Sequence, residues 1–418
     1  MSAQVQRLVA AVDLGSSRVV AIIGEVTGDA HSWGLRILGI ASEPSNGLRR
    51  GVIRDFDEVV RAVRKAVTDA ERMAGIEVGT VDVGVAGELV AHRISHGTAS
   101  IQGSEVRTAD LARVIDIASD VSFGHDQELL HAIAHDYRVD AQPGFADPIG
   151  MAGDSLSAEV YLVTARSSAL SHIRRAVEKA GWHVGEFVLE PLAASLSVLT
   201  PDEREAGAVL LEFGAGSTSM SIFQGGRLRH VVALRFAGGH VTSDLVHGLQ
   251  VPQADAERLK VEFGSAYEPM VPENEVVELA PVGGQGTRHA PRRLIAHIMH
   301  MRLQEVAELA YDEVARAGYT MGALPGGVIL SGAGAAAPGM VELVRDVFAA
   351  PVRLGVPAAG LRGLVDRVTF TACAVPVGLA LYGARQVAFG GGFGAGGRSS
   401  PAVEKVLGPV KRWLQDFF

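Results

Sequence analysis

Two segments of the chain place an acidic residue directly before a short turn of glycine and hydroxyl residues. The first is Asp13-Leu-Gly15-Ser16-Ser17, and the second is Glu212-Phe-Gly214-Ala215-Gly216-Ser217-Thr218. Backbone N–H groups and hydroxyls in such turns can hold phosphate oxygens, and the acid can hold Mg²⁺ through its water molecules. Either turn alone fits an ordinary hairpin as well. Two of them, at equivalent places in similar halves, favour a phosphate-binding clamp.

A third segment, Gly327-Val-Ile-Leu-Ser331-Gly332-Ala333-Gly334, is an apolar strand that runs into a turn of small residues. We expect the helix that follows at residues 339–348. Small side chains in this turn would let a flat base or ribose lie against the backbone. A plain strand-to-helix turn is the alternative.

The first two turns each join a pair of predicted strands. These strands are residues 8–12 with 18–24, and residues 208–213 with 218–223. This repeat of strand, turn and strand predicts two similar lobes that face each other, and a third strand is expected at residues 228–234 after a hairpin turn. Helical patterns at residues 55–73 and 167–180 make the fold α/β. Short strands with one helix, near 108–119, predict an inserted subdomain.

The last 29 residues have a different composition. Residues 390–401 are rich in glycine and serine and predict a flexible linker. Residues 402–418 form an amphipathic helix when they are placed at helical spacing. Its apolar face holds Val403, Val406, Leu407, Val410, Trp413, Leu414, Phe417 and Phe418. Because Lys405, Lys411 and Arg412 lie opposite, we expect this helix to bind an anionic membrane surface.

Two alternatives remain for this helix, namely packing on the protein's own core and binding in a groove of a partner protein. Gly408-Pro409 interrupts the pattern, so the stable part is expected to begin at Pro409.

Charge and composition limit the classes of function. The formal net charge is −9, and without a basic excess we expect no nucleic-acid partner. The single cysteine, Cys373, is consistent with a reducing compartment. The N-terminal residues lack the apolar stretch of a signal peptide, and no run reaches the roughly 20 apolar residues that span a bilayer. We therefore expect a cytoplasmic chain with peripheral membrane contact.

The three turn segments, in this order, resemble the phosphate-1, phosphate-2 and adenosine motifs of the ATPase superfamily of actin, heat-shock chaperones and sugar kinases. Within it, the chain resembles the FtsA family of bacterial cell-division proteins over essentially its whole length. Residues 147–156, 197–204 and 239–244 carry this closer match, and residues 408–417 resemble the family's membrane-targeting sequence.

The resemblance implies an actin-like two-lobed fold, with two ribonuclease-H-like cores around a nucleotide cleft and an inserted small α+β subdomain. The implied order is subdomain 1A (1–83), 1C (84–164), 1A again (165–196), 2A (197–240), 2B (241–304), 2A again (305–372) and a return to 1A (373–389), before the linker and the helix.

The resemblance also implies ATP and Mg²⁺ as cofactors. Asp13 and Glu212 would hold the Mg²⁺ through water. The residues expected to contact the nucleotide are Gly15, Ser16, Ser17, Arg18, Gly214, Ala215, Gly216, Ser217, Thr218, Glu257, Lys260, Gly332, Ala333 and Gly334. For Glu257 and Lys260 the alternative is an exposed ion pair on one helix. Glu190 is a candidate to orient the attacking water, or else an acid that complements a helix dipole.

The chain departs from the family's usual pattern at Glu212, Ala215, Ser219 and Ala333. Glu212 stands where aspartate is usual, and its extra methylene moves the carboxylate by about a bond length, which matters for the octahedral geometry of Mg²⁺. We therefore expect ATP binding with slow or absent hydrolysis.

In the family, the lobe after the second turn receives the C-terminal peptide of the tubulin-like protein FtsZ. Arg288 and Arg302 occupy two of the family's basic positions here, although ordinary surface arginines are the alternative. The resemblance further implies homopolymers, later division proteins as partners, and a location on the cytoplasmic side of the inner membrane at the division site. Competing hypotheses are a scaffold of the pilus-assembly type and a sugar-kinase-like or chaperone-like ATPase.

Overall fold

The computed structural model describes residues 7–28, 32–45, 47–140, 142–145, 147–280 and 286–389. The predicted linker and C-terminal helix, including Val410, Lys411, Arg412, Trp413, Leu414, Phe417 and Phe418, lie outside these residues. In the part of the chain that the structure describes, no helix is long and apolar enough to cross a membrane.

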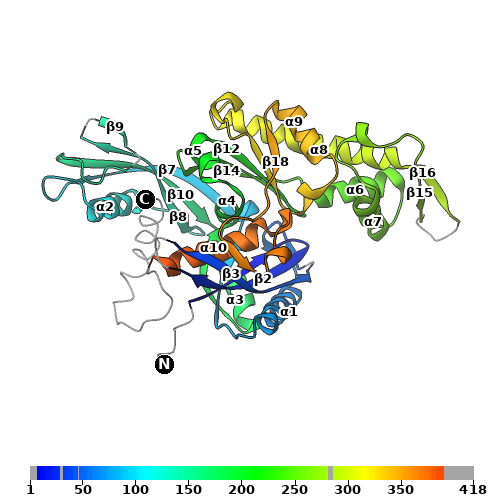
Figure 1. Cartoon of the computed structure of the whole chain (residues 1–418), viewed down its shortest axis with the longest axis horizontal. Coiled ribbons are helices and arrows are strands. Elements are labelled where there is room, and N and C mark those ends of the chain that lie inside the picture. The colour runs from blue at the N-terminus through cyan, green and yellow to red at the C-terminus, as the bar shows by residue number, and fades with distance from the viewer. Residues whose placement is uncertain are drawn as a thin grey trace.

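The first lobe is built on a six-stranded sheet with the order β11-β6-β1-β2-β3-β19. β1 to β3 form an antiparallel meander, and β6 lies parallel to β1. The strands are β1 (Leu8–Leu14), β2 (Arg18–Thr27), β3 (Gly34–Pro44), β6 (Thr80–Val85), β11 (His183–Leu189) and β19 (Leu361–Gly363). Helices α1 (Phe56–Ala74) and α3 (Ser167–Ala180) lie below this sheet in Figure 1, and α10 (Ala374–Ala388) lies above it.

Helix α1 shows how local sequence sets an element. Its N-cap, Asp55, accepts a hydrogen bond from the Glu58 N–H, with 3.1 Å between the atoms. Gly75 ends the helix in the left-handed conformation, with a φ of 67°. Between these ends, residues such as Val59, Val63 and Ala70 are buried against the sheet, so one apolar face holds the helix in place.

The second lobe repeats this topology in a five-stranded sheet, β14-β13-β12-β17-β18. Its meander corresponds to β1–β3, and β17 lies parallel to β12 as β6 lies parallel to β1. The strands are β12 (Ala208–Phe213), β13 (Thr218–Gln224), β14 (Arg227–Leu234), β17 (Val328–Ser331) and β18 (Val352–Leu354). The predicted repeat of two similar lobes is therefore confirmed.

The remaining helices either join the lobes or extend the second one. Helix α4 packs against α10 and contacts both sheets, so these two helices lie between the lobes. The additional helices are α4 (Glu190–Val198), α5 (Pro201–Ala206), α6 (Gly238–Leu249), α7 (Gln253–Phe263), α8 (Arg292–Arg316) and α9 (Met340–Phe348). Two small sheets of two strands each are formed by β4 (Leu48–Arg49) with β5 (Val52–Ile53), and by β15 (Val276–Leu279) with β16 (Arg288–Pro291). Short 3₁₀ turns are η1 (Gly87–Leu89), η2 (Glu268–Met270), η3 (Met321–Ala323), η4 (Ala333–Ala336), η5 (Val365–Arg367) and η6 (Thr371–Cys373).

The inserted subdomain is a separate antiparallel sheet, β7-β10-β8-β9, with a single helix on one face. Its elements are β7 (Val90–Ser100), α2 (Thr108–Ser119), β8 (Glu128–Val139), β9 (Gln142–Phe145) and β10 (Ser155–Ala165). They enclose a hydrophobic core of their own. The subdomain lies at one end of the molecule, and α6, α7 and the β15–β16 hairpin lie at the opposite end (Figure 1).

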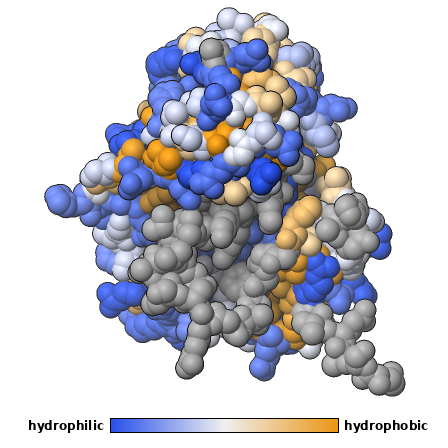
Figure 2. All heavy atoms as spheres, turned by 90° about the vertical axis from the view of Figure 1, so that its left-hand side faces the viewer, coloured by the Kyte–Doolittle hydropathy of each residue, from blue (hydrophilic) through white to orange (hydrophobic). Residues whose placement is uncertain are grey.

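The end of the molecule formed by the inserted subdomain is mostly hydrophilic, with hydrophobic side chains between the hydrophilic ones (Figure 2). Ile94, Ile117 and Ile149 are exposed hydrophobic residues of this subdomain. Single exposed side chains of this kind are usual on protein surfaces, so they assign no binding role to this end.

A buried histidine attaches the inserted subdomain to the first lobe. His131 of β8 accepts a hydrogen bond from the Leu189 N–H of β11 at its Nε2, over 3.0 Å. Burial lowers the pKa of His131 to about 4. Because a protonated ring could no longer accept this bond, the attachment requires the neutral imidazole.

A ring stack attaches the same subdomain to the second lobe. Tyr161 of β10 lies between the rings of His92 and His135, with centroid distances of 4.9 and 5.0 Å. Its hydroxyl accepts the Val231 N–H of β14 over 3.2 Å, and His135 Nε2–H donates to the Leu228 carbonyl over 2.7 Å. The inserted subdomain is therefore fixed to both lobes.

We predict that His131 makes the protein sensitive to acid. The pKa of His131 is about 4 in the folded chain and 6.5 in the unfolded chain, so its stabilising effect is present above pH 6.5 and is lost as the pH falls toward 4. Between about pH 7.5 and pH 5 this loss corresponds to about 2 kcal/mol. Urea unfolding of wild type and His131→Gln at both pH values would measure it.

Between the same two pH values, the free energy of unfolding of His131→Gln should fall by less than that of the wild type, because the variant lacks the buried imidazole. Replacement of the exposed His172 by glutamine is the matched control, and it should follow the wild type. Equal pH dependence of wild type and His131→Gln would contradict the assignment.

Candidate functional site

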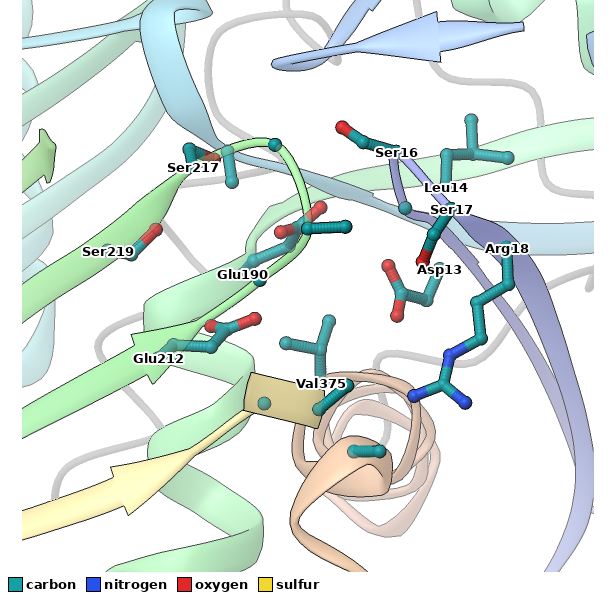
Figure 3. A pocket seen from close by; sticks show the side chains of 18 of the residues that line it. Asp13, Leu14, Ser16, Ser17, Arg18, Glu190, Glu212, Ser217, Ser219 and Val375 are labelled. Atoms are coloured by element: carbon teal, nitrogen blue, oxygen red, sulfur yellow. The ribbon is translucent and has the colours of Figure 1, made fainter. Parts of the chain in front are cut away.

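A pocket between the two lobes collects the residues of the three predicted turns. The β1–β2 turn, the β12–β13 turn and the turn after β17 form its walls, together with the start of α4 and of α10 (Figure 3). The predicted site residues that line it are Asp13, Gly15, Ser16, Ser17, Arg18, Glu190, Glu212, Gly214, Ala215, Gly216, Ser217, Gly332 and Ala333. Segments about 200 and 320 residues apart in sequence therefore meet in one place.

The first two turns have the same local geometry. A Cβ atom at Gly15 would lie 2.8 Å from the Arg18 carbonyl oxygen, and one at Gly214 would lie 2.8 Å from the Ser217 carbonyl oxygen. Each turn is therefore too tight to accommodate a side chain at its glycine, Gly15 in the first turn and Gly214 in the second.

The tips of these two turns also contact each other across the cleft. A Cβ atom at Gly216 would overlap Ser16 Oγ of the first turn. Glycine at this position therefore lets the two lobes approach, and a group held by one turn is within reach of the other.

Three carboxyl groups point into the pocket from different elements (Figure 3). Asp13 lies near the end of β1, Glu212 near the end of β12, and Glu190 at the start of α4. Desolvation raises the pKa of Asp13 to about 6, although Arg18 opposes the rise, and it raises the pKa of Glu212 to about 8 with help from the charge of Asp13. Desolvation and these two acids raise the pKa of Glu190 well above its usual value.

These carboxyls fit a hydrated cation. Glu212 Oε2 is buried and has no hydrogen-bond partner among the described residues. Ionisation of all three groups in one desolvated pocket is unfavourable, and a nearby divalent cation would favour their ionised forms. Within the described ranges, no group of three or more metal-binding side chains is placed to hold an ion directly. Carboxylates are ligands that suit Mg²⁺, which usually keeps several of its water molecules.

We predict that Glu212→Gln stabilises the protein in the absence of nucleotide and metal. The pKa of Glu212 is raised from 4.5 to about 8, so stability that is present below pH 4.5 is lost as the pH rises toward 8. An amide cannot ionise, and at about pH 8 the variant should unfold with a free energy higher by a few kcal/mol.

Thermal and urea unfolding in EDTA would measure this effect. The exposed Glu205, replaced by glutamine, is the control and should leave the pH profile unchanged. A Glu212→Gln protein that is less stable than wild type at pH 8 would refute the prediction.

Four predicted residues lie outside the pocket lining. Thr218 is buried, and its hydroxyl donates to the Phe236 carbonyl over 2.8 Å. A Cβ atom at Gly334 would contact Phe213, so this glycine serves close packing of η4 on β12. These two residues support the turns and do not face the cleft.

Glu257 and Lys260 of α7, which were expected to contact the nucleotide, form an ion pair with each other, with 2.7 Å between Oε2 and Nζ. Lys260 is only 17% exposed, and its Nζ also donates to the Thr242 hydroxyl over 2.9 Å and the Gly238 carbonyl over 3.2 Å. The pair is therefore not merely an exposed ion pair, because it ties α7 to the start of α6 beside the second turn.

Several pocket residues were not among the predicted ones. Gly51 and Ala86 come from the first lobe, Thr371 and Ala372 come from η6, and Val375 comes from the start of α10. The Gly332 N–H donates to the Thr371 carbonyl over 3.0 Å, which brings the third turn against η6. No local motif marks these residues, since tertiary packing alone brings them to the cleft.

The two arginines expected to bind a partner differ in their surroundings. Arg288 is exposed on β16. Arg302 of α8 is held by both carboxylate oxygens of Asp244, with distances of 2.6 and 3.1 Å, and it also pairs with Glu305. The guanidinium of Arg302 lies over the Phe236 ring.

Comparison with known proteins supports the resemblance. A family model described as "Cell division protein FtsA" matches residues 209–378, and one described as "SHS2 domain inserted in FTSA" matches residues 87–164. A "Cell division protein FtsA" of Pseudomonas aeruginosa is 36% identical over 420 residues that cover all of both chains. The chain belongs to the FtsA family of cell-division proteins. The FtsA of Escherichia coli K12 is 30% identical over 99% of each chain.

Solved structures show the fold. The "PilM-PilN type IV pilus biogenesis complex" is similar with a TM-score of 0.63 at 16% identity, over 90% of this chain and 98% of that chain. "MreB5 of Spiroplasma citri bound to ADP" is similar with a TM-score of 0.53 at 13% identity, over 90% and 96%. The α/β, actin-like two-lobed fold that the FtsA resemblance implied, with its inserted subdomain, is confirmed.

Proposed function

We propose that this chain binds ATP with Mg²⁺ between its lobes, polymerises, and tethers the FtsZ ring to the cytoplasmic face of the inner membrane. The contact between two glycine turns, beside three desolvated carboxyls, is the observation that carries the nucleotide part. Membership of the FtsA family supports the role in division.

In this proposal the turns bind phosphate and the carboxyls bind the hydrated cation. Ser16, Ser17 and Ser217 supply hydroxyls, and Asp13 and Glu212 hold the water shell of Mg²⁺. Mg²⁺ supplies charge neutralisation of the phosphate oxygens. Gly332 and Ala333 leave room for the adenosine. The similar MreB5 structures are described as bound to ADP and to AMPPNP, which supports the class of ligand.

Glu190 is the candidate to orient an attacking water. Burial and the neighbouring acids Asp13 and Glu212 raise its pKa. The longer Glu212 side chain, which displaces the carboxylate from its usual place beside Mg²⁺, supports slow or absent hydrolysis. ATP then acts mainly as a structural ligand.

We predict that Gly216→Ala weakens ATP binding at least about tenfold, because its methyl group would overlap Ser16 Oγ and push the two turns apart. Titration with a fluorescent ATP analogue and Mg²⁺ would measure the affinity, and circular dichroism would check the fold. Gly79→Ala is the matched control, because a Cβ atom there meets nothing within 4 Å. Unchanged affinity of Gly216→Ala, or a wild-type chain that binds no ATP, would refute the proposed site.

Attachment to the membrane is proposed to use residues 402–418. One short helix binds weakly, so polymerisation of several chains would increase retention through avidity. The acidic C-terminal peptide of FtsZ would bind the second lobe, with Arg288 and Arg302 as the basic positions. Later division proteins would then gather on this assembly at the division site.

We predict that the full-length chain sediments with anionic liposomes and that a chain ending at Ser400 does not. Trp413→Glu in the full-length chain should reduce binding at least about tenfold, because it places a charge on the apolar face. Gln415→Ala, on the polar face, is the control and should bind like wild type. Equal lipid binding by the full-length and shortened chains would overturn the tether.

A further inference from the structure

A short segment of the first lobe lies against both glycine turns. Arg50 lies between β4 and β5, and its N–H donates to Ser16 Oγ of the first turn over 3.2 Å. A Cβ atom at Gly216 of the second turn would lie 3.3 Å from the same nitrogen. The backbone of Arg50 therefore marks the point where the two turns meet.

The conformation of Arg50 is unusual for a residue with a side chain. Its φ is 53°, in the left-handed region that favours glycine. Gly51 beside it also has a positive φ, of 79°. Arg50 and Gly51 are the two central residues of the turn between β4 and β5, and two-residue hairpin turns commonly hold both of these residues at positive φ. The turn therefore accounts for the backbone conformation, and glycine at position 50 could adopt it without strain.

The side chain of Arg50 reaches the other lobe. Its Nη2 lies 3.2 Å from Nε2 of His240 in α6, and both residues are half-buried. The other ring nitrogen of His240, Nδ1, lies 3.2 Å from the Ala237 N–H and caps the start of the helix.

The helix that His240 caps is bonded to the second turn. The N–H groups of Gly238 and Gly239 donate to the carbonyls of Gly214 and Ala215, over 3.1 and 2.9 Å. A displacement of the start of α6 would therefore move the second turn. Arg50 is linked to the first turn through its backbone and to the second turn through its side chain.

The imidazole of His240 cannot serve both neighbours at once. Burial, Arg50 and Arg302 lower the pKa of His240, and Asp244 and the bond from the Ala237 N–H oppose this shift. A neutral imidazole has one acceptor nitrogen. Both Arg50 and the Ala237 N–H approach it as donors. The contact between the lobes thus competes with the helix cap, and loss of the guanidinium would strengthen the cap.

We propose that Arg50 is a positioning residue that sets the spacing of the two phosphate turns. This inference rests on the proposed nucleotide site. In this proposal the third phosphate of ATP lies between the two turns and contacts both. The affinity for ATP then depends on the spacing of the turns, and so on Arg50, more than the affinity for ADP does.

The test compares ATP and ADP affinities of full-length variants. Arg50→Gly keeps the left-handed backbone and its N–H but removes the guanidinium. It should weaken ATP binding about tenfold and ADP binding much less, as expected for loss of one charged contact. Its unfolding temperature without nucleotide should not fall, because the helix cap gains its acceptor, whereas a merely structural residue would destabilise the free protein.

Three further variants complete the test. Arg50→Lys keeps a cation and should restore part of the ATP affinity. His240→Ala should weaken ATP binding at least as much as Arg50→Gly, because it also removes the acceptor for the Ala237 N–H at the start of α6. The double variant should bind ATP no more weakly than His240→Ala, because Arg50 acts through its contact with His240. Arg49→Ala, at the exposed neighbouring position, is the control and should bind like wild type.

The role of Arg50 would be overturned if Arg50→Gly bound ATP and ADP as tightly as wild type, or if the effects of the two substitutions were additive. Either result would leave the proposed nucleotide site standing. A wild-type chain that binds no ATP would overturn this inference together with the nucleotide site.

Discussion

The two lobes meet around three carboxyl groups that are costly to ionise together, because all three lie in one desolvated pocket. Asp13 and Glu212 come from equivalent strands of two similar sheets, and Glu190 begins the helix that lies between them. Ionised groups of like sign are unfavourable at this depth unless a cation is present. The folded chain therefore holds a site that is energetically incomplete by itself, and a bound cation would stabilise it.

Local sequence predicted those parts of the fold that local interactions determine. The helices expected at residues 108–119 and 167–180 occur as Thr108–Ser119 and Ser167–Ala180. The repeat of an acid followed by a glycine turn correctly predicted two similar lobes, because strand pairing across a short turn involves only neighbouring residues. The resemblance, carried over to the residues of the three turns, supplied most of the pocket lining.

Contacts between distant segments were not predictable in this way. Thr371 reaches the pocket because η6 packs against η4 and β17, and Val375 reaches it because α10 packs between the lobes. Tyr161 lies between two histidines from other strands, and Arg50 meets His240 across the cleft. Such contacts depend on how whole elements dock, and no periodicity in one segment records them. The resemblance to a family supplied the overall arrangement, but not these contacts.

The two hydrogen bonds from Arg302 to Asp244 have a consequence for any acidic ligand of the second lobe. Asp244 acts as an internal substitute for the ligand, because it already offers the guanidinium the paired carboxylate geometry that such a ligand would offer. Replacement of the Asp244 carboxylate by a ligand carboxylate at Arg302 would therefore contribute little net binding free energy. A peptide carboxylate that replaced Asp244 at Arg302 would therefore be held weakly and would dissociate readily, whatever its other contacts with the second lobe.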